Sequence, residues 1–203
     1  PPGSAGMRGG DNTIDAAFAQ ALALHRAGRL ADAAAAYRGV LAASPDHGDA
    51  LHYLGLLAHQ SDDDEEAIRL IGRAIEVAGP DPLRHYNLGE AYRAHGQPVE
   101  AARCYRATLA ADPDDGGAEL GLADSLYDMG ELKAALDHYR RARALLPEDP
   151  EVHNNLANAL LDRGDTEGAL AGFDRTLAVD PTFAEAHLNW ANALLGASRV
   201  DEA

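Results

Sequence analysis

The sequence predicts an all-α protein built as an α-solenoid, in which pairs of helices stack one after another along the chain. The main observation is a 34-residue period, which is the length of one helix–turn–helix unit and implies that each unit buries its apolar face against its neighbours. Alanine and leucine dominate, and aromatic residues make up only 5% of the chain. Glycine and proline also recur at fixed offsets, where they end helices. The clearest column contains Ala33, Ala67, Ala101, Ala135, Ala169 and Ala203.

The N-terminal segment, residues 1–12, is rich in Pro, Gly and Ser and shows no apolar periodicity, so we predict that it is disordered. Met7 is a candidate native start, in which case the residues before it come from an expression tag. Thr13 can cap the first helix with its hydroxyl, and Asp15 would lie in the first turn, where the helix dipole favours an acid. We therefore expect one repeat domain over residues 13–203.

Each repeat is predicted to contain a helix A of about 13 residues, a turn, a helix B of similar length and a break marked by proline. Glycine ends helix A because it adopts the left-handed conformation easily, and proline stops helix B because it cannot continue the helix. We expect five complete pairs and an eleventh helix without a partner. The repeats are 14–47, 48–81, 82–115, 116–149, 150–183 and a partial sixth, 184–203.

Two more columns predict the core. Small residues allow helices A and B of one repeat to approach closely; they are Ala21, Gly55, Gly89, Ala123, Ala157 and Ala191. Bulky residues of helix B fill the space between repeats; they are Tyr37, Ile71, Tyr105, Tyr139 and Phe173. We interpret both columns as packing residues and not as ligand contacts, because a stripe at helical spacing is what stacked repeats require.

Charge and composition disfavour several classes of partner. The formal net charge of −16 opposes the phosphate neutralisation needed to bind nucleic acid, and it also opposes docking on anionic membranes. No apolar run approaches the ~20 residues that span a bilayer. The single Cys104 has no second cysteine with which to form a disulfide, which favours a reducing compartment and a cytoplasmic location.

The chain contains no Gly-rich phosphate loop, nucleophile elbow or acid/base pair, so we expect no catalytic residue and no cofactor. His85, His153 and His187 share one column, but successive repeats lie about 10 Å apart, beyond the ~2 Å of a metal–imidazole bond. The acidic run 62–66 lacks the alternating ligands and central glycine of a calcium loop, and we interpret it as a solvated turn. No metal site is predicted.

The columns resemble those of the tetratricopeptide repeat (TPR) family, which has a small residue beside a leucine in helix A, a turn glycine, an alanine and an aromatic residue in helix B, and a final proline. In repeat 150–183 these positions are Leu156, Ala157, Gly164, Ala169, Phe173 and Pro181. The resemblance implies a right-handed superhelix that binds protein partners, with helix A lining a concave groove. The departures are Gln20 in place of Leu or Trp, Asp62 in place of the turn glycine, and a displaced proline in 79–82, where we expect slack.

Asparagines concentrate at the groove positions that this resemblance implies. Asn87, Asn155 and Asn189 share one column, Asn158 and Asn192 share another, and Asn154 stands beside them. A carboxamide can donate to a peptide carbonyl and accept from a peptide N–H, so a row of them can hold an extended chain with little regard for its side chains. The alternative is that asparagine here is only general family consensus, although it is a poorer helix former than alanine by about half a kcal/mol. Tyr53, Gly121 and Ala19 interrupt the first column, so the hypothesis depends on the last two repeats.

The segments 155–158 and 189–192, Asn-Leu-Ala-Asn and Asn-Trp-Ala-Asn, resemble the repeats of O-GlcNAc transferase-type TPR superhelices. Those superhelices bind protein substrates along an inner asparagine row. The resemblance therefore implies a non-catalytic peptide-binding module, or the substrate-recognition arm of a larger enzyme such as a bacterial glycosyltransferase.

Most other groove positions are acidic: Asp15, Asp49, Glu90, Asp124, Asp128, Glu151, Asp162 and Glu185, against Arg26 and Arg93. We expect a negative electrostatic field in the groove and a neutral to basic partner. The alternative for several of these acids is that they lie in first turns and interact favourably with the helix dipole. The family's carboxylate clamp, which grips acidic tails, needs lysine and arginine at these positions. The predicted peptide-binding residues are Asn87, Glu90, Asp124, Asn154, Asn155, Asn158, Asn189 and Asn192.

The last prediction concerns the C-terminal end, because Ala203 stands where a sixth helix B would begin. A complete array ends in a capping helix with a polar outer face. Without one, the apolar residues of the eleventh helix stay uncovered, and burying one such leucine contributes about 2 kcal/mol. We expect either fraying from about Asn192 onward or self-association as a two-fold homodimer. The alternative function is a structural adaptor that assembles through its open ends. The predicted self-association residues are Leu188, Trp190, Leu194 and Leu195.

Overall fold

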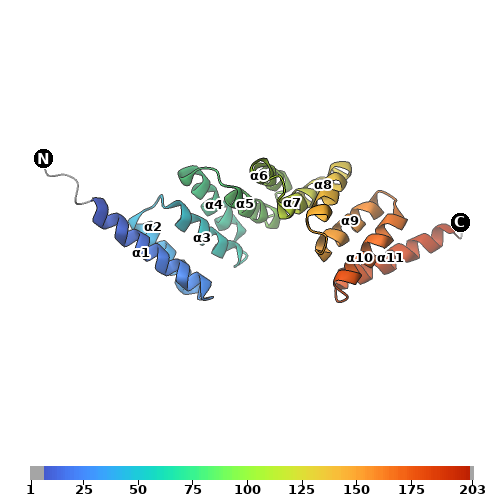
Figure 1. Cartoon of the computed structure of the whole chain (residues 1–203), viewed down its shortest axis with the longest axis horizontal. Coiled ribbons are helices and arrows are strands. Elements are labelled where there is room, and N and C mark those ends of the chain that lie inside the picture. The colour runs from blue at the N-terminus through green and yellow to red at the C-terminus, as the bar shows by residue number, and fades with distance from the viewer. Residues whose placement is uncertain (1–6, 202–203) are drawn as a thin grey trace. The chain divides into compact units, whose positions relative to one another are not determined.

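The computed structural model describes the backbone of residues 7–201 and the side chains of residues 12–196, and all regular elements in this part of the chain are α-helices (Figure 1). The chain forms two compact units, unit 1 ending at Gly96 and unit 2 beginning at Gln97. Unit 1 contains α1 (Met7–Arg26), α2 (Leu30–Ala43), α3 (Gly48–His59), α4 (Asp64–Ala78) and α5 (Pro82–Ala94). Unit 2 contains α6 (Pro98–Ala111), α7 (Gly116–Asp128), α8 (Leu132–Leu145), α9 (Pro150–Asp162), α10 (Thr166–Val179) and α11 (Ala184–Asp201).

These eleven helices of the described residues confirm the predicted all-α solenoid of helix-pair repeats. Odd-numbered helices are the A helices and even-numbered helices are the B helices. In unit 2, α9 contacts α7, α8, α10 and α11, so the three A helices lie side by side in one layer. None of the helices in the described residues has the length and apolar composition needed to cross a bilayer.

The helix starts are set mainly by aspartates. The carboxylates of Asp81, Asp115 and Asp149 accept hydrogen bonds from backbone N–H groups in the first turns of α5, α7 and α9, and Asp63 and Asp165 do the same for α4 and α10. Each such cap stabilises its helix by about 1 kcal/mol. The predicted break before these A helices therefore ends helix B and also supplies the residue that caps the next helix A.

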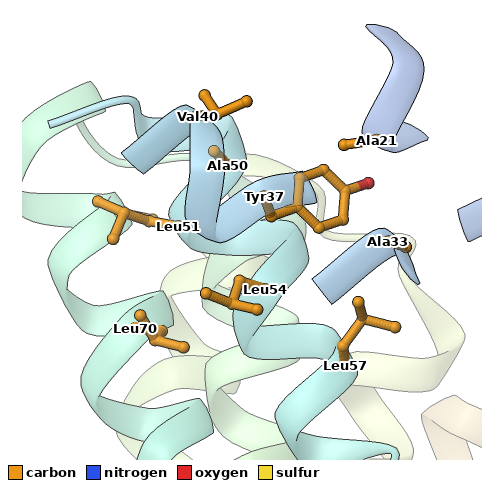
Figure 2. Close-up of a cluster of buried hydrophobic side chains, with 10 residues drawn as sticks. Ala21, Ala33, Tyr37, Val40, Ala50, Leu51, Leu54, Leu57 and Leu70 are labelled. Atoms are coloured by element: carbon orange, nitrogen blue, oxygen red, sulfur yellow. The ribbon is translucent and has the colours of Figure 1, made fainter. Parts of the chain in front are cut away.

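The predicted core columns are buried. In the alanine column, all members within the described side chains have no exposed surface, and the bulky column from Tyr37 to Phe173 is buried almost completely. Figure 2 shows this packing in unit 1, where Tyr37 of α2 lies in one cluster with Ala21 of α1 and Leu54 of α3. Ala191 is the exception among the small residues, because it is exposed on α11.

Both ends of the described chain differ from prediction. Helix α1 begins at Met7, six residues before the predicted start at Thr13, because extending an existing helix adds a hydrogen bond for each residue fixed. The rest of the segment predicted to be disordered, residues 1–6, lies outside the described residues. Helix α11 runs on to Asp201, because Ser198 stands at the position of the turn glycine and no glycine ends the helix there.

The turn after one A helix, α3, contains a residue other than glycine in the left-handed region. Four of the other turns after A helices place glycine in this region, with φ between +72° at Gly28 and +85° at Gly164. Asp62 occupies the same position after α3 with φ of +58°, which an L-residue with a Cβ adopts at a steric cost of about 1 kcal/mol. The acidic run 62–66 is also more than a solvated turn, because Asp63 caps α4 and Asp64 accepts a hydrogen bond from His59.

We therefore expect Asp62→Gly to raise the free energy of unfolding by up to about 1 kcal/mol. Chemical denaturation monitored by circular dichroism would measure the change. Asp62→Asn is the matched control, because it removes the same charge and keeps the Cβ. Equal stabilisation by both variants would assign the effect to charge and refute backbone strain.

Candidate functional site

The candidate site is a row of amide and carboxyl side chains on the A helices of unit 2. It consists of Asp124 on α7, Asn154, Asn155 and Asn158 on α9, and Glu185 and Asn189 on α11; we call it the acid–amide row. All six lie on neighbouring helices of a single layer. The row contains five of the eight predicted peptide-binding residues, together with Glu185.

Glu185 organises one end of the row. Its Oε1 atom accepts hydrogen bonds from the carboxamide groups of Asn154 at 3.1 Å, Asn158 at 3.4 Å and Asn189 at 3.3 Å. Asn189 also donates to Oδ1 of Asn158 at 3.0 Å. Three asparagines from two helices therefore converge on one carboxylate, and their orientations are set by it.

Asp124 organises the other end. Its Oδ1 accepts hydrogen bonds from Nδ2 of Asn155 at 3.1 Å and from the hydroxyl of Tyr139 at 2.7 Å. Burial, followed by the charge of Asp124, raises the pKa of Tyr139, so this hydroxyl keeps its proton and remains a donor. A bond of 3.3 Å from Asn154 to Oδ1 of Asn155 links the two ends.

This arrangement changes what the asparagines can offer to a ligand. Their N–H₂ groups already donate to Asp124, Glu185 or one another, whereas ionised carboxylates can only accept. The row therefore presents mainly oxygen acceptors. It suits ligand groups that donate hydrogen bonds, such as peptide N–H, ammonium and guanidinium groups, better than it suits carbonyls or carboxylates.

One predicted binding residue within the row is buried, and three others lie outside the row. Asn154 is only 1% exposed and its buried Oδ1 has no hydrogen-bond partner. This corrects the prediction that Asn154 lines the groove, because its side chain is turned inward and its Nδ2 donates to Glu185 of α11.

Asn192, which lies outside the row, is exposed. Asn87 and Glu90 belong to unit 1, where Asn87 donates to Nε2 of His52 at 2.9 Å and Glu90 pairs with Arg93. Burial lowers the pKa of His52, which favours the neutral ring that can accept this bond.

The sequence did not reveal the role of one member of the row, Glu185, or of one residue that holds the row in place, Tyr139. Glu185 was predicted as a groove acid but not as a binding residue, although its position four residues before Asn189 places both on one helix face. Tyr139 was interpreted as core only. Its ring is indeed buried, but its hydroxyl reaches Asp124, and nothing in the spacing of the bulky column distinguishes this tyrosine from Phe173.

Other side chains singled out in the sequence have structural roles. The rings of His153 and His187 each hydrogen-bond the carbonyl of the proline six residues earlier at 2.9 Å, and the ring of His85 hydrogen-bonds the carbonyl of Asp81 at 3.0 Å. No group of three potential metal ligands occurs among the described residues. Burial raises the pKa of the Cys104 thiol to about 11, which keeps it protonated and unreactive at neutral pH.

The gap in the asparagine column at Gly121 has a steric cause. A Cβ built at this position would lie 2.4 Å from Cζ of Tyr105, and that ring is completely buried. Any side chain at 121 would therefore displace a core residue between repeats. The column cannot be completed here without repacking α6 against α7.

We expect Gly121→Ala to lower the free energy of unfolding by about 1–3 kcal/mol through overpacking, as measured by chemical denaturation. Gly39→Ala is the matched control, because Gly39 also lies within a helix but a Cβ there meets nothing within 4 Å. The control should be stabilising, as alanine is the better helix former. If Gly121→Ala were equally stabilising, the steric account of the gap would be wrong.

Comparison with known proteins supports this fold. A family model described as tetratricopeptide repeat matches residues 16–81, 86–150 and 154–203, and a second model with the same description matches residues 126–178. No curated protein sequence matches significantly.

Several solved structures are similar. The TPR protein YrrB superposes with a TM-score of 0.77 at 20% identity, over 88% of this chain and 93% of its own. MamA from Desulfovibrio magneticus RS-1 gives 0.78 at 16% identity, over 84% and 97%. The TPR protein TTC0263 from Thermus thermophilus gives 0.64 at 21% identity, over 90% and 99%. With most of its length matched by the family model, the chain belongs to the tetratricopeptide repeat family.

Proposed function

We propose that this chain is a non-catalytic protein-interaction module that binds an extended, neutral to basic segment of a partner along the acid–amide row. The observation that carries the proposal is the convergence of asparagine donors on Asp124 and Glu185. It leaves a row of acceptors held in fixed positions before any ligand arrives. Preorganised groups of this kind bind more tightly because less side-chain freedom is lost on association.

The dimensions of the layer suit an extended peptide. Helices α7 and α11 flank α9, and at about 10 Å for each helix step their carboxylates are at most about 20 Å apart. An extended chain covers that distance in about six residues. A segment with two basic residues within that span could place one near Asp124 and the other near Glu185, while its backbone N–H groups meet the carboxamide oxygens between them.

Two further observations favour a peptide ligand. The similar structure of YrrB is described as a TPR protein with an unusual peptide-binding site. The acids on the A helices of unit 2 would also steer basic segments toward the row, an effect that salt screens over about 10 Å at 0.1 M.

The test uses short labelled peptides of alternating Lys and Ser, compared with peptides of alternating Glu and Ser, in fluorescence anisotropy titrations. We expect the Lys peptides to bind more tightly, and less so as salt rises. Asp124→Asn combined with Glu185→Gln should weaken binding by about tenfold or more, since two charge-assisted contacts are lost. The matched control is Glu167→Gln with Asp174→Asn, which removes two exposed acids from α10.

A second set of variants addresses the amides. Replacing Asn155, Asn158, Asn189 and Asn192 together by Ala should abolish binding while helicity stays equal or rises slightly. A preference for Glu peptides, or affinity unchanged in both sets of variants, would refute the proposal. The same face would serve as the substrate-recognition arm if the chain is part of a larger enzyme such as a bacterial glycosyltransferase, and the discovery of a catalytic domain in the same gene would support that role.

A structural adaptor is the second candidate function, and the exposed leucines of α11 favour it. Leu188 is 62%, Leu195 60% and Leu194 37% exposed, whereas Trp190 packs partly against the core around Phe173. Ala191 is exposed beside them. Covering such a surface with a second copy would bury apolar area worth about 2 kcal/mol for each leucine.

If the chain is an adaptor, sedimentation should show concentration-dependent self-association that is lost in Leu188→Ser with Leu195→Ser. Leu83→Ser is the matched control, because Leu83 is 59% exposed on α5 in unit 1 and should leave assembly unchanged. A chain that stays monomeric at all concentrations would exclude this function.

A further inference from the structure

A second surface feature of unit 2 lies on α6, α7 and α8 and shares no residue with the acid–amide row. It is a pocket of about 470 Å³ lined by apolar side chains, among them Leu109, Pro113 and Leu122, which we call the apolar floor, and by Arg106 and Arg141. This volume is within the ~300–1,000 Å³ of sites that bury a ligand group. We call it the α6–α8 pocket.

The pocket wall contains a buried carboxylate that is hydrogen-bonded to an imidazole ring. Glu119, whose side chain is 5% exposed, accepts a hydrogen bond from Nδ1 of His138 at 2.5 Å, and its other oxygen lies 3.7 Å from Nη1 of Arg141. The corresponding positions two repeats earlier are Leu51 and Leu70, both buried. The same place in the fold therefore accepts an apolar pair.

This difference is informative because burying a carboxylate costs free energy that well-packed apolar residues of similar size do not cost. Packing alone does not account for Glu119 and His138. Their carboxylate–imidazole pair instead holds a polar wall beside an open pocket and draws Arg141 toward it.

The two B helices beside the pocket, α6 and α8, carry six basic residues against two acidic ones, Glu100 and Asp137, which is opposite to the balance of the whole chain. Helices α6 and α8 carry Arg103, Arg106, Lys133, Arg140, Arg141 and Arg143, whereas α7 and α9 contain no lysine or arginine. Arg106 forms no ion pair within the described part of the chain, and Arg141 contacts only the already paired Glu119. The pocket therefore has one arginine without an ion pair among the described residues, Arg106, and a second, Arg141, whose carboxylate partner is shared with His138.

We propose that the α6–α8 pocket binds an acidic peptide segment of a partner protein, with one apolar side chain in the pocket and flanking carboxylates on Arg106 and Arg141. Charge complementarity selects this ligand, because guanidinium groups pair with carboxylates through paired hydrogen bonds and the floor needs an apolar group to fill it. The site is independent of the acid–amide row, which prefers the opposite charge.

The test uses the full chain and a short fluorescein-labelled peptide with a central Leu flanked by Glu. We expect it to bind, and we expect weaker binding when Lys replaces the flanking Glu or when Ser replaces the Leu. Arg106→Glu with Arg141→Glu should reduce affinity by about tenfold or more, since like charges would then face the ligand. The matched control, Arg140→Glu with Arg175→Glu, reverses two exposed arginines of unit 2 that already pair with Asp137 and Glu148, and it should change affinity much less.

A second variant tests the buried pair. Glu119→Leu with His138→Leu introduces the residues found two repeats earlier, so the melting temperature should be unchanged or higher, while affinity for the Glu peptide should rise because Arg141 loses its carboxylate partner. A lower melting temperature with unchanged affinity would show a structural role only and would overturn the assignment of the pair to the site. Failure of the Glu peptide to bind, or equal binding by the Lys peptide, would overturn the proposal. Self-association that requires Arg106 and Arg141, without peptide binding, would identify a second copy as the occupant and would also overturn it.

Discussion

The structure depends on the packing of one bulky helix-B residue per repeat against small residues of the helices beside it. A single helix pair exposes as much apolar surface as it covers, so no repeat can bury its core alone. The complete burial of Tyr37, Ile71, Tyr105 and Phe173 shows where that surface goes. Because these columns occupy the inward-facing positions, specificity for a partner depends on the positions that the packing does not use.

Packing and binding are nevertheless not independent, since the same aromatic residues reach the surface of the A helices. In one repeat the ring of Tyr105 occupies the space over Gly121 and leaves no room for an asparagine side chain. In the next repeat the hydroxyl of Tyr139 donates to Asp124 and helps to hold the acid–amide row in place. The outline of the row is therefore set partly by which core aromatic lies beneath each position.

The fold could be predicted from the sequence because a strict period constrains every repeat at once. The turn glycines have the expected left-handed conformation, and the alanine and bulky columns are buried as expected. The extent of α1 and α11 could not be predicted in the same way, because helix ends outside complete repeats depend on propensity and not on packing.

The candidate site was less predictable, because its hydrogen bonds join residues about 27–31 positions apart, as in Asn158 to Glu185 and Asn155 to Asp124. Periodicity identifies the face that a side chain occupies, but not its partner on the next helix. Asn154 illustrates the limit: its spacing places it on the same face as Asn158, yet it is buried and its Nδ2 donates to Glu185 of α11.

Net charge is a poor guide to the surfaces of a layered repeat protein. The value of −16 describes the whole chain, but in unit 2 the acids concentrate on A helices and the arginines on α6 and α8. Beyond a Debye length of about 10 Å, exposed charges are largely screened from one another. Each face of unit 2 therefore acts through its own local charge, so a chain with a large negative total can still present a cationic surface to an acidic partner.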